Sequence, residues 1–249
     1  MENIQLKENE VLETLKQNGF KIIQDKKRFC FGIDAILLAN FAEIRNNDNV
    51  YDLGTGNGII PLLLAKSFRL NSITGLEIQT ECAQMAERSV KINSLENKIK
   101  IVNGDIKNVS KLFPKAKADA VVSNPPYMIN QHGKQNPGDS KAIARHEVLC
   151  SLDDVVSAAE YLLKPQGRFY MIHRPFRLAE IIVTLSKHNL ETKKIRLVHP
   201  FADKEPNMVL IEARKFANSR VTIEKPLVVY DTPGTYTAEV QKILEQPIC

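Results

Sequence analysis

Cysteines are few in this sequence, and they are not arranged as metal ligands or disulfide partners. The four cysteines are scattered along 249 residues, without a CxxC pair or a cluster of cysteine and histidine: Cys30, Cys82, Cys150 and Cys249. Small zinc domains and disulfide-stabilised secreted domains both depend on such patterns. The scatter argues against either class, and we expect a reduced, cytoplasmic protein without a metal.

Long apolar segments are also missing. The longest apolar stretch, from Ile59 to Ala65, is far shorter than the roughly 20 residues that a membrane-spanning helix needs. The first residues, Met1 to Gln5, are polar and acidic and do not resemble a signal peptide. We therefore expect no membrane partner, and we take a monomer as the default oligomeric state.

Two common nucleotide-binding signatures are absent from the sequence. Their absence limits the kinds of ligand site that a glycine-rich stretch at residues 51–58 can form. This stretch reads Tyr-Asp-Leu-Gly-Thr-Gly-Asn-Gly and joins an apolar strand to a helix. Because position 59 is Ile59, the dinucleotide fingerprint G-x-G-x-x-G fails, and no Gly-Lys-Ser/Thr follows that would make a phosphate-binding P-loop. The glycines still permit unusual backbone angles and close approach of a ligand, and the helix amides after Gly58 face a polar or anionic group.

The composition is that of an ordinary soluble globular protein. Hydrophobic residues make up 43% of the chain and charged residues 25%, which is enough apolar material for a large core. The formal net charge of +5 is modestly basic. Such a charge is compatible with a nucleic-acid partner, but many proteins without one share it.

From Val50 onward, strand-like and helix-like segments alternate, which predicts βαβ units and an α/β fold with a mostly parallel sheet. We predict seven strands, near residues 49–53, 72–77, 99–103, 119–123, 167–173, 193–199 and 207–213. We predict helices near residues 58–68, 80–93, 151–163 and 176–188. Only Pro200 to Pro206 separate the last two strands, too few residues for a parallel crossover, so this pair should form an antiparallel hairpin at one edge.

The segments on either side of this core have patterns of their own. Residues 1–48 form a preface that we expect to pack on the core: helical spacing at 8–15, a strand at 20–24, and an apolar helix from Ile33 to Phe41 with Asp34 as its N-cap. Residues 49–215 are the predicted central domain. Residues 216–249 are an extension, not an independent domain, with one strand-like piece, a turn at Pro233-Gly234 and a short helix against the sheet edge. The polar stretch 128–147 is a loop long enough to be functional or disordered.

Acidic residues end the second and third predicted strands. Glu77 lies 23 residues after Gly54. From this position a carboxylate can accept hydrogen bonds from both ribose hydroxyls of an adenosine-containing cofactor. Asp105 follows the third strand and can bond an adenine amino group, cap the next helix, or do both. A solvated carboxylate is the alternative for Glu77.

The stretch Asn124-Pro125-Pro126-Tyr127 follows the fourth strand, residues 118–123. Two consecutive prolines cannot donate hydrogen bonds to a sheet, so the strand must end there in a stiff loop. In open α/β sheets, ligands bind at the carboxyl ends of the strands. The alternative is a proline turn that only ends a strand.

The chain resembles the class I S-adenosylmethionine-dependent methyltransferases, which have a Rossmann-like fold. The resemblance lies in the order of four features: the glycine loop with Asp52, then Glu77, Asp105 and the Asn-Pro-Pro-Tyr motif. Among these methyltransferases, the chain resembles the amino-methyltransferases that carry this motif, over about residues 29–214. The resemblance implies a seven-stranded, mostly parallel sheet with one antiparallel edge strand. It also implies S-adenosyl-L-methionine as the cofactor, held by residues of the loop, the strand ends and the preface: Phe29, Asp52, Gly54, Gly56, Gly58, Glu77, Ile78, Asp105, Ile106 and Asn124.

The motif suits methylation of an exocyclic amine or an amide, whose lone pair is delocalised. The Asn124 side-chain oxygen and the Pro125 carbonyl can each accept one N–H and so direct the lone pair toward the methyl donor. Tyr127 would stack on a planar substrate, and Pro125 and Pro126 would keep the loop rigid. Phe29 and Phe31 are expected either to close over the cofactor or to belong to the core.

Three acceptors fit the motif: an adenine N6, a guanine N2 in RNA, and a glutamine amide of a translation release factor. The release-factor enzymes carry a larger domain ahead of the core than 48 residues can form. The pattern from Phe31-Gly32-x-Asp34 to Ala39 and the stretch from Val198 to Ala213 resemble the bacterial tRNA1(Val) adenine-N6 methyltransferases. This resemblance implies methylation of the adenine next to the anticodon of a valine tRNA; a non-catalytic RNA-binding module is the remaining alternative.

Two groups of basic residues are candidates for contacting RNA phosphates. Residues 193–225 contain eight Lys or Arg against four acids, and a solvated basic face is the alternative. The second group lies in the polar loop: Lys134, Lys141, Arg145 and His146. His146 lacks a partner in the sequence that would make it a catalytic base.

Overall fold

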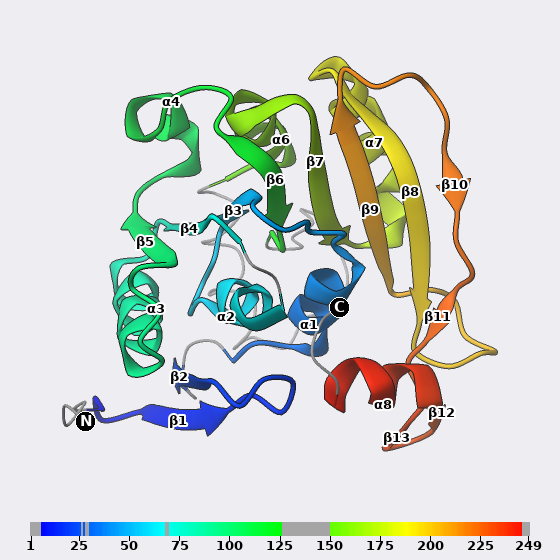
Figure 1. Cartoon of the computed structure of the whole chain (residues 1–249). Coiled ribbons are helices and arrows are strands. Elements are labelled where there is room, and N and C mark those ends of the chain that lie inside the picture. The colour runs from blue at the N-terminus through cyan, green and yellow to red at the C-terminus, as the bar shows by residue number, and fades with distance from the viewer. Residues whose placement is uncertain (1–5, 26, 28–29, 68–69, 126–149, 246–249) are drawn as a thin grey trace.

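The computed structural model describes residues 6–25, 27, 30–67, 70–125 and 150–245, and its centre is one extended β-sheet (Figure 1). The sheet has nine strands, in the order β10-β8-β9-β7-β6-β3-β4-β5, with β11 also paired to β8. The seven longer strands are β3 (Asn49–Leu53), β4 (Ser72–Glu77), β5 (Ile99–Asn103), β6 (Ala118–Ser123), β7 (Leu163–His173), β8 (Leu190–His199) and β9 (Met208–Lys215). They correspond to the seven strands expected from the sequence, and the α/β class is confirmed.

Strand direction follows the predicted pattern, with one difference. β3, β4, β5, β6 and β7 pair in parallel, and β9 runs antiparallel to both β7 and β8. The β8–β9 hairpin is therefore confirmed, but the reversed strand is not at the edge, because β9 lies between β7 and β8. The outer side of β8 is covered by the two-residue strands β10 (Thr222–Ile223) and β11 (Leu227–Val228), which supply hydrogen-bond partners that an edge strand would otherwise lack.

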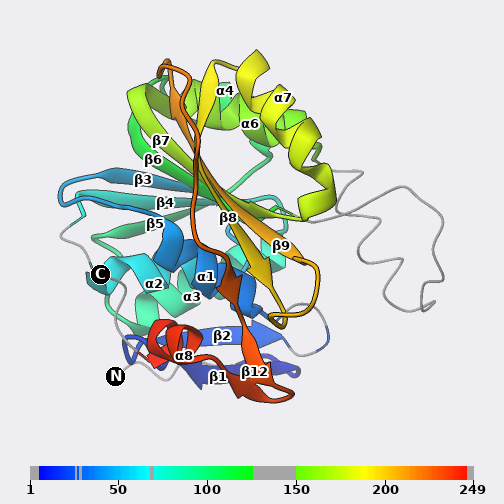
Figure 2. The same ribbon diagram turned by 90° about the vertical axis from the view of Figure 1, so that its right-hand side faces the viewer.

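Helices cover both faces of the sheet (Figure 2). α6 (Leu152–Leu162) and α7 (Leu178–Lys187) lie on one face, and α1 (Ile33–Phe41), α2 (Ile59–Ser67) and α3 (Thr80–Ile92) lie on the other. Short turns of helix complete the connections: η1 (Ile106–Asn108), α4 (Val109–Leu112) and η2 (Pro175–Arg177). Two apolar clusters match the two faces, one with the α1 and α2 side chains and one with those of α6 and α7.

Local sequence explains where α6 begins. Ser151 is its N-cap, and the Ser151 hydroxyl accepts the Asp154 N–H at 3.2 Å while the Asp154 carboxylate accepts the Ser151 N–H at 2.8 Å. This reciprocal capping box satisfies two backbone donors that a helix start leaves unpaired.

Helix α1 is buried between the sheet and its neighbours, as its apolar sequence predicts. Residues 35–39 are all buried, and the helix contacts α2 and β7. Its N-cap is Gly32, not Asp34 as predicted. Asp34 is the second residue of the helix, and its carboxylate accepts the Ala35 N–H at 2.9 Å. The carboxylate therefore stabilises the start of the helix from within the first turn.

The start of the preface is a strand, so the prediction of a helix at 8–15 is wrong. β1 (Glu10–Thr14) pairs antiparallel with β2 (Lys21–Asp25), which confirms the second predicted element. Glu10 also accepts two hydrogen bonds from the Arg88 guanidinium of α3, at 2.7 and 2.5 Å. Apolar residues spaced three or four apart over one short segment fit a strand as well as a helix, and pairing with β2 decides between them.

A buried ion pair joins the preface to the sheet. The Arg168 guanidinium on β7 lies 2.6 Å from the Asp48 carboxylate, both nearly inaccessible to solvent, and it also donates to the Glu43 carbonyl. Removing one partner of such a pair leaves an uncompensated buried charge, which typically costs about 3–5 kcal/mol. The contact therefore fixes the end of α1 against β7.

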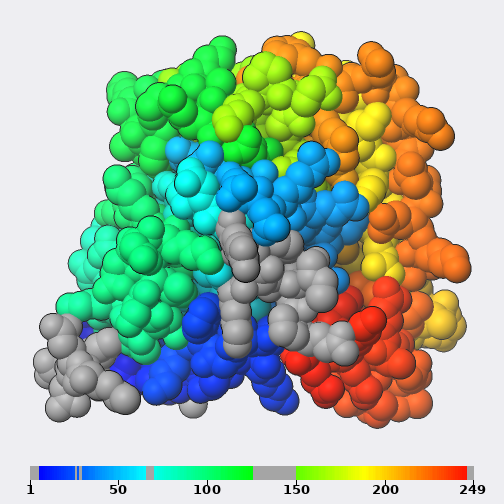
Figure 3. Space-filling model, in the orientation of Figure 1, coloured from blue at the N-terminus to red at the C-terminus, as the bar shows by residue number. Residues whose placement is uncertain are grey.

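The carboxyl-terminal extension runs along the β8 side of the molecule, seen as the orange and red segments of Figure 3. After β10 and β11 it forms the hairpin of β12 (Tyr230–Thr232) and β13 (Thr235–Tyr236) and ends in α8 (Ala238–Glu245). The predicted turn contains Gly234 with φ +82°, and the extension packs on the sheet edge as expected. No helix among the described residues is long and apolar enough to cross a membrane.

Candidate functional site

The glycine loop connects β3 to α2 at the carboxyl edge of the parallel strands. Gly54, Gly56 and Gly58 have φ values of +77°, +57° and +84°, which side chains disfavour. The Gly54 and Thr55 amides both donate to the Leu76 carbonyl of β4, at 2.9 and 3.1 Å. The loop is thus tied to the end of the neighbouring strand.

Glu77 joins the same two elements through its side chain. One carboxylate oxygen accepts the Gly56 N–H at 2.9 Å and the other accepts the Gln79 N–H at 2.8 Å. Glu77 is nearly buried at the end of β4, so the alternative of a solvated carboxylate does not hold. Each oxygen keeps a second lone pair, which leaves the carboxylate able to accept further hydroxyl donors.

Asp52 is a buried carboxyl group without a hydrogen-bond partner among the described residues. It lies on β3 directly before the loop, is 0% exposed, and neither side-chain oxygen accepts a hydrogen bond there. Burial is the main reason why the pKa of Asp52 is raised to about 7; the nearby Thr55 hydroxyl lowers this pKa and the Glu77 charge raises it. A group in this state favours a positive charge close to it.

Asp105 is a helix cap, one of its two predicted roles. Its carboxylate accepts the Lys107 N–H at 2.9 Å at the start of η1. The neighbouring Asn103 donates to the Glu77 and Ile78 carbonyls at 2.8 and 3.1 Å, so the ends of β4 and β5 are held together. Ile78 and Ile106 are both partly exposed beside these residues.

Asn124 and Pro125 follow β6, which pairs in parallel with β3. The Ser123 hydroxyl at the end of β6 donates to the Leu53 carbonyl at 2.8 Å, directly before Gly54. The sheet therefore brings Asn124 next to the glycine loop, although 70 residues separate them in sequence. Pro125 is buried, and Asn124 is half-buried.

The side chain of Asn124 contacts the preface. Its Nδ2 donates to Oδ2 of Asp34 at 3.1 Å, across 90 residues. The sequence predicts Asp34 as a helix cap and as part of the Phe31-Gly32-x-Asp34 pattern, and it predicts no pairing for Asn124. The signal in the sequence for this contact is a carboxylate two residues after a glycine, at the start of an apolar helix.

Three of the predicted site residues, Phe29, Pro126 and Tyr127, lie outside the described residues. The polar loop and its four basic or titratable residues do as well. Phe31 is partly buried and packs on the apolar cluster of α1 and α2, so the core alternative applies to it. The residues that the structure brings together at this edge are Asp52, Gly54, Gly56, Gly58, Glu77, Ile78, Asp105, Ile106, Asn124 and Pro125.

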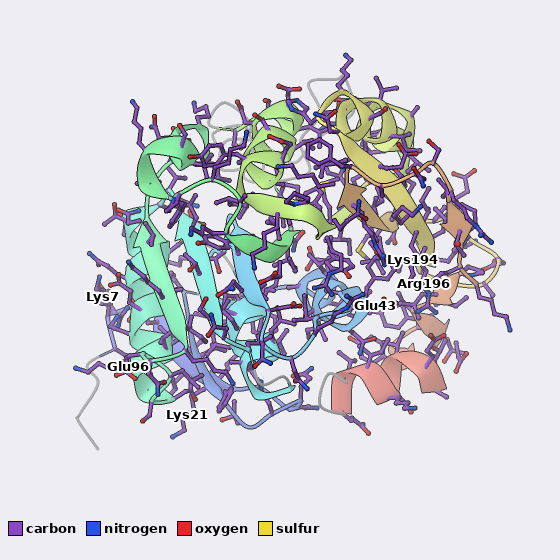
Figure 4. All side chains as sticks on the ribbon, turned by 45° about the horizontal axis from the view of Figure 1, so that its top comes forward. Lys7, Lys21, Glu43, Glu96, Lys194 and Arg196 are labelled. Carbon is purple, nitrogen blue, oxygen red and sulfur yellow. The ribbon has the colours of Figure 1, made fainter. Side chains whose placement is uncertain are left out.

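The basic stretch at 193–225 is largely used inside the protein. Five of its eight cations lie against carboxylates: Lys194 against Glu43 (Figure 4), Arg196 against Glu239 at 2.5 Å, Lys204 against Asp203 at 3.3 Å, Arg214 against Glu212 at 2.7 Å, and Lys215 against Glu160 at 2.8 Å. Lys194 also lies 3.6 Å from Glu212 and 3.8 Å from Glu224. Lys194, Arg196 and Lys215 join β8 and β9 to the preface, α8 and α6, which speaks against the phosphate-binding role predicted for them.

The described residues fit a cofactor that carries both a ribose and a positive charge. Asp52 provides an unpartnered buried carboxyl, Glu77 provides acceptor oxygens, and the loop has no side chain at Gly54 or Gly56 to obstruct a ligand. Among the described residues, no three histidine, cysteine or acidic side chains cluster as metal ligands would. The edge is therefore suited to an organic, nucleoside-bearing cation.

Comparison with known proteins identifies the family of the chain. A family model described as methyltransferase small domain matches residues 31–196. A curated relative from Porphyromonas gingivalis, named tRNA1(Val) (adenine(37)-N6)-methyltransferase, is 28% identical over 222 residues, covering 86% of this chain and 86% of the relative.

Solved structures share the fold. A predicted O-methyltransferase from Agrobacterium tumefaciens superimposes with a TM-score of 0.69 at 22% identity, covering 86% of this chain and 97% of that one. Geranyl diphosphate C-methyltransferase from Streptomyces coelicolor, crystallised with S-adenosyl-L-homocysteine, gives a TM-score of 0.56 at 15% identity, covering 73% and 78%. At these identities the likeness concerns the fold alone.

Proposed function

The chain belongs to the methyltransferase small domain family, and from this premise we propose that it transfers a methyl group from S-adenosyl-L-methionine to the N6 amino group of an adenine in tRNA. The finer target that we propose is the adenine next to the anticodon of a valine tRNA, in keeping with the names of relatives that cover most of the chain. We expect a monomer acting in the cytoplasm, where tRNA is found.

The observation that carries this proposal is the position of Asn124. Its amide lies at the end of β6, beside the glycine loop that follows β3, and its nitrogen is bound to Asp34. The other polar atom of the amide, Oδ1, is an acceptor only. An acceptor beside a cofactor loop is what an amino substrate requires.

The residues then have distinct tasks. Bound S-adenosyl-L-methionine supplies an electrophilic methyl group on a sulfonium. Glu77 and the glycine loop hold the nucleoside part, and Asp52 favours the positive charge. Asn124 Oδ1 and the Pro125 carbonyl accept the two N–H groups of the adenine amine, so that its lone pair points away from them.

The proton balance needs no base before the attack. The amino nitrogen gains one methyl group and loses one proton, which leaves after the new bond has formed. Tyr127 is our candidate for stacking on the adenine, and the adenine must first leave its own stack, at a cost of a few kcal/mol.

Two other acceptors fit the motif but do not have the support of these relatives. Guanine N2 and a protein glutamine amide present similar N–H groups to Asn124. The relatives that support adenine are 28% identical over 222 and 237 residues. A non-catalytic RNA-binding role is disfavoured because the predicted site residues that the structure describes lie at one edge of the sheet.

The test is a methylation assay with the full-length protein. Labelled S-adenosyl-L-methionine and bulk tRNA are incubated with the enzyme, and the RNA is digested to nucleosides. We expect the label in N6-methyladenosine. Label only in N2-methylguanosine, or only in protein glutamine, would refute the adenine assignment. Mass spectrometry of tRNA from cells lacking the protein should show the same modification missing.

A further inference from the structure

Asp34 on α1 and Asn124 after β6 form a side-chain contact that the reaction described above does not use. We propose that Asp34 is a positioning residue for methyl transfer, which fixes the Asn124 amide with its oxygen toward the acceptor amine. The inference rests on the proposed function, because it assumes an amino group as the acceptor.

The chemistry of the two side chains determines the orientation. An asparagine amide has a donor end and an acceptor end of nearly the same size, so shape alone does not select between them. A carboxylate accepts hydrogen bonds and cannot donate them. Asp34 Oδ2, at 3.1 Å, therefore binds Nδ2 and rejects Oδ1. If the amide were reversed, it would present N–H groups to an amine that needs an acceptor.

Asp34 is itself held in place from two sides. Its other oxygen, Oδ1, accepts the Ala35 N–H at 2.9 Å in the first turn of α1. Residues 35–39 of that helix are buried, so the helix start does not shift freely. Both oxygens of the carboxylate thus have a defined donor.

Gly32 leaves the space that Asp34 needs. A Cβ atom at position 32 would lie 2.7 Å from Asp34 Oδ1 and 3.5 Å from its Cγ. The backbone of Gly32 has φ −98° and ψ 178°, an extended conformation open to any residue. Gly32 therefore gives the Asp34 carboxylate room, and a side chain at position 32 would displace that carboxylate, which links the Gly32-x-Asp34 pattern to the orientation of Asn124.

A purely structural role for Asp34 is the competing explanation. An acid in the first turn of a helix stabilises that helix wherever it occurs. Such a role would lower thermal stability without a specific effect on turnover. A positioning role instead predicts a specific loss in kcat, with little change in cofactor affinity.

The first test compares kcat of four variants with bulk tRNA and S-adenosyl-L-methionine. Asp34→Leu removes the acceptor, and we expect kcat to fall roughly 10- to 100-fold, the range for a hydrogen bond to a charged group. Asp34→Asn keeps one acceptor oxygen, whereas the carboxylate serves two donors, the Ala35 N–H and Asn124 Nδ2, so it should recover only part of the activity. Gly32→Ala should also lose less kcat than Asp34→Leu, because it displaces the carboxylate without removing it. Asp153→Ala, which removes an exposed acid from the first turn of α6 (His188 at 2.8 Å), is the matched control and should keep wild-type kcat.

A double variant separates the two explanations. If Asp34 acts through Asn124, adding Asp34→Leu to Asn124→Ala should cause no further loss of kcat, because the group that it positions is already gone. A further loss as large as that in the wild-type background would overturn the proposal.

A readout without substrate distinguishes this proposal from the proposed function. In ¹⁵N NMR spectra, the Asn124 side-chain NH₂ should exchange slowly with solvent in the wild-type protein and faster in Asp34→Leu. If wild type does not methylate tRNA but shows this difference, the proposed function fails and the Asp34–Asn124 contact is supported. Equal exchange in both proteins would overturn the contact. Should Asp34→Leu not fold, the same comparison is made with Gly32→Ala.

Discussion

The two sides of the site are held by different kinds of contact. On the glycine-loop side, the Glu77 carboxylate accepts backbone N–H groups of Gly56 and Gln79, and the loop amides donate to a β4 carbonyl. On the Asn124 side, the amide donates to the side chain of Asp34, which comes from outside the sheet. The first side depends on the register of adjacent strands, and the second depends on where α1 packs.

Glycines have different tasks on the two sides. Gly54, Gly56 and Gly58 adopt positive φ angles, so backbone conformation requires them. Gly32 has an ordinary φ, and its role is to leave room, because a Cβ there would displace the Asp34 carboxylate. We conclude that substitutions on the first side should affect stability and cofactor affinity, and those on the second side mainly turnover.

Asn124→Ala should have the largest effect and should affect only the acceptor side. Losing one preorganised acceptor costs on the order of 100- to 1000-fold in kcat, while the contacts of Glu77 with the loop are untouched. Calorimetry should give an unchanged Kd for S-adenosyl-L-methionine. Asn218→Ala, at an exposed asparagine after β9, is the control. Normal turnover in Asn124→Ala would remove this residue from the mechanism.

Glu77→Gln should affect the opposite side. The amide keeps one acceptor oxygen but loses the charge and the second acceptor, so we expect roughly 10- to 100-fold weaker binding of S-adenosyl-L-methionine. The kcat at saturating cofactor should change much less than it does in Asn124→Ala. An unchanged Kd would show that this carboxylate serves only the loop backbone.

Asp52→Asn should change how stability depends on pH. In the folded protein the Asp52 pKa is about 7, above its ordinary value near 4, so the folded state holds the proton more tightly. Stability from this group is therefore present at low pH and lost as pH rises to 7, by about 2 kcal/mol from pH 5 to pH 7. Urea unfolding of both proteins at pH 5, 6 and 7 measures the difference.

The comparison between the two proteins isolates Asp52 from other titrating groups. Burial and the nearby Arg177 charge lower the His173 pKa to about 4, so its contribution to stability is present above about pH 6.5 and is lost as pH falls toward 4. This opposite pH dependence of stability is common to wild type and Asp52→Asn, so it cancels when the stabilities of the two proteins are subtracted at each pH. Parallel pH profiles would contradict a raised Asp52 pKa.

Gly58→Ala should have the smallest effect, and Gly234→Ala is its matched control. Both glycines have φ near +80°, at +84° and +82°, so both substitutions should cost on the order of 1–2 kcal/mol of stability. Only at Gly58 would the new Cβ also lie close to another side chain, Ala86 Cβ at 3.1 Å. Thermal unfolding should show the larger loss for Gly58→Ala, and only that variant should weaken cofactor binding. Equal losses of stability in the two variants would contradict this prediction, because they would show that the loop can shift to make room for the new Cβ.

Much of the fold follows from patterns in the sequence. The alternation of strands and helices predicts the seven main strands, because buried parallel strands need apolar residues at nearly every position. The spacing from Gly54 to Glu77 and the strand end at Asn124 likewise predict that these residues meet at one edge. The boundaries at 48/49 and 215/216 stay predictions.

Other features depend on long-range contacts that no local pattern encodes. Residues 10–14 form a strand because β2 pairs with them, and β9 lies inside the sheet because it pairs with β7 as well as with β8. The cations of residues 193–225 look like a phosphate-binding surface in the sequence, but carboxylates from α6, α8 and the preface neutralise several of them.

By itself the sequence determined the class of fold, because periodicity, glycine and proline act locally, and it predicted the cofactor edge and the amide that we propose receives the substrate. Only the tertiary structure decided how that amide is oriented. Asp34 and Asn124 are 90 residues apart, and the packing of α1 beside the sheet brings them together. An amide has two nearly equal ends, and it takes a partner from elsewhere in the chain to choose between them.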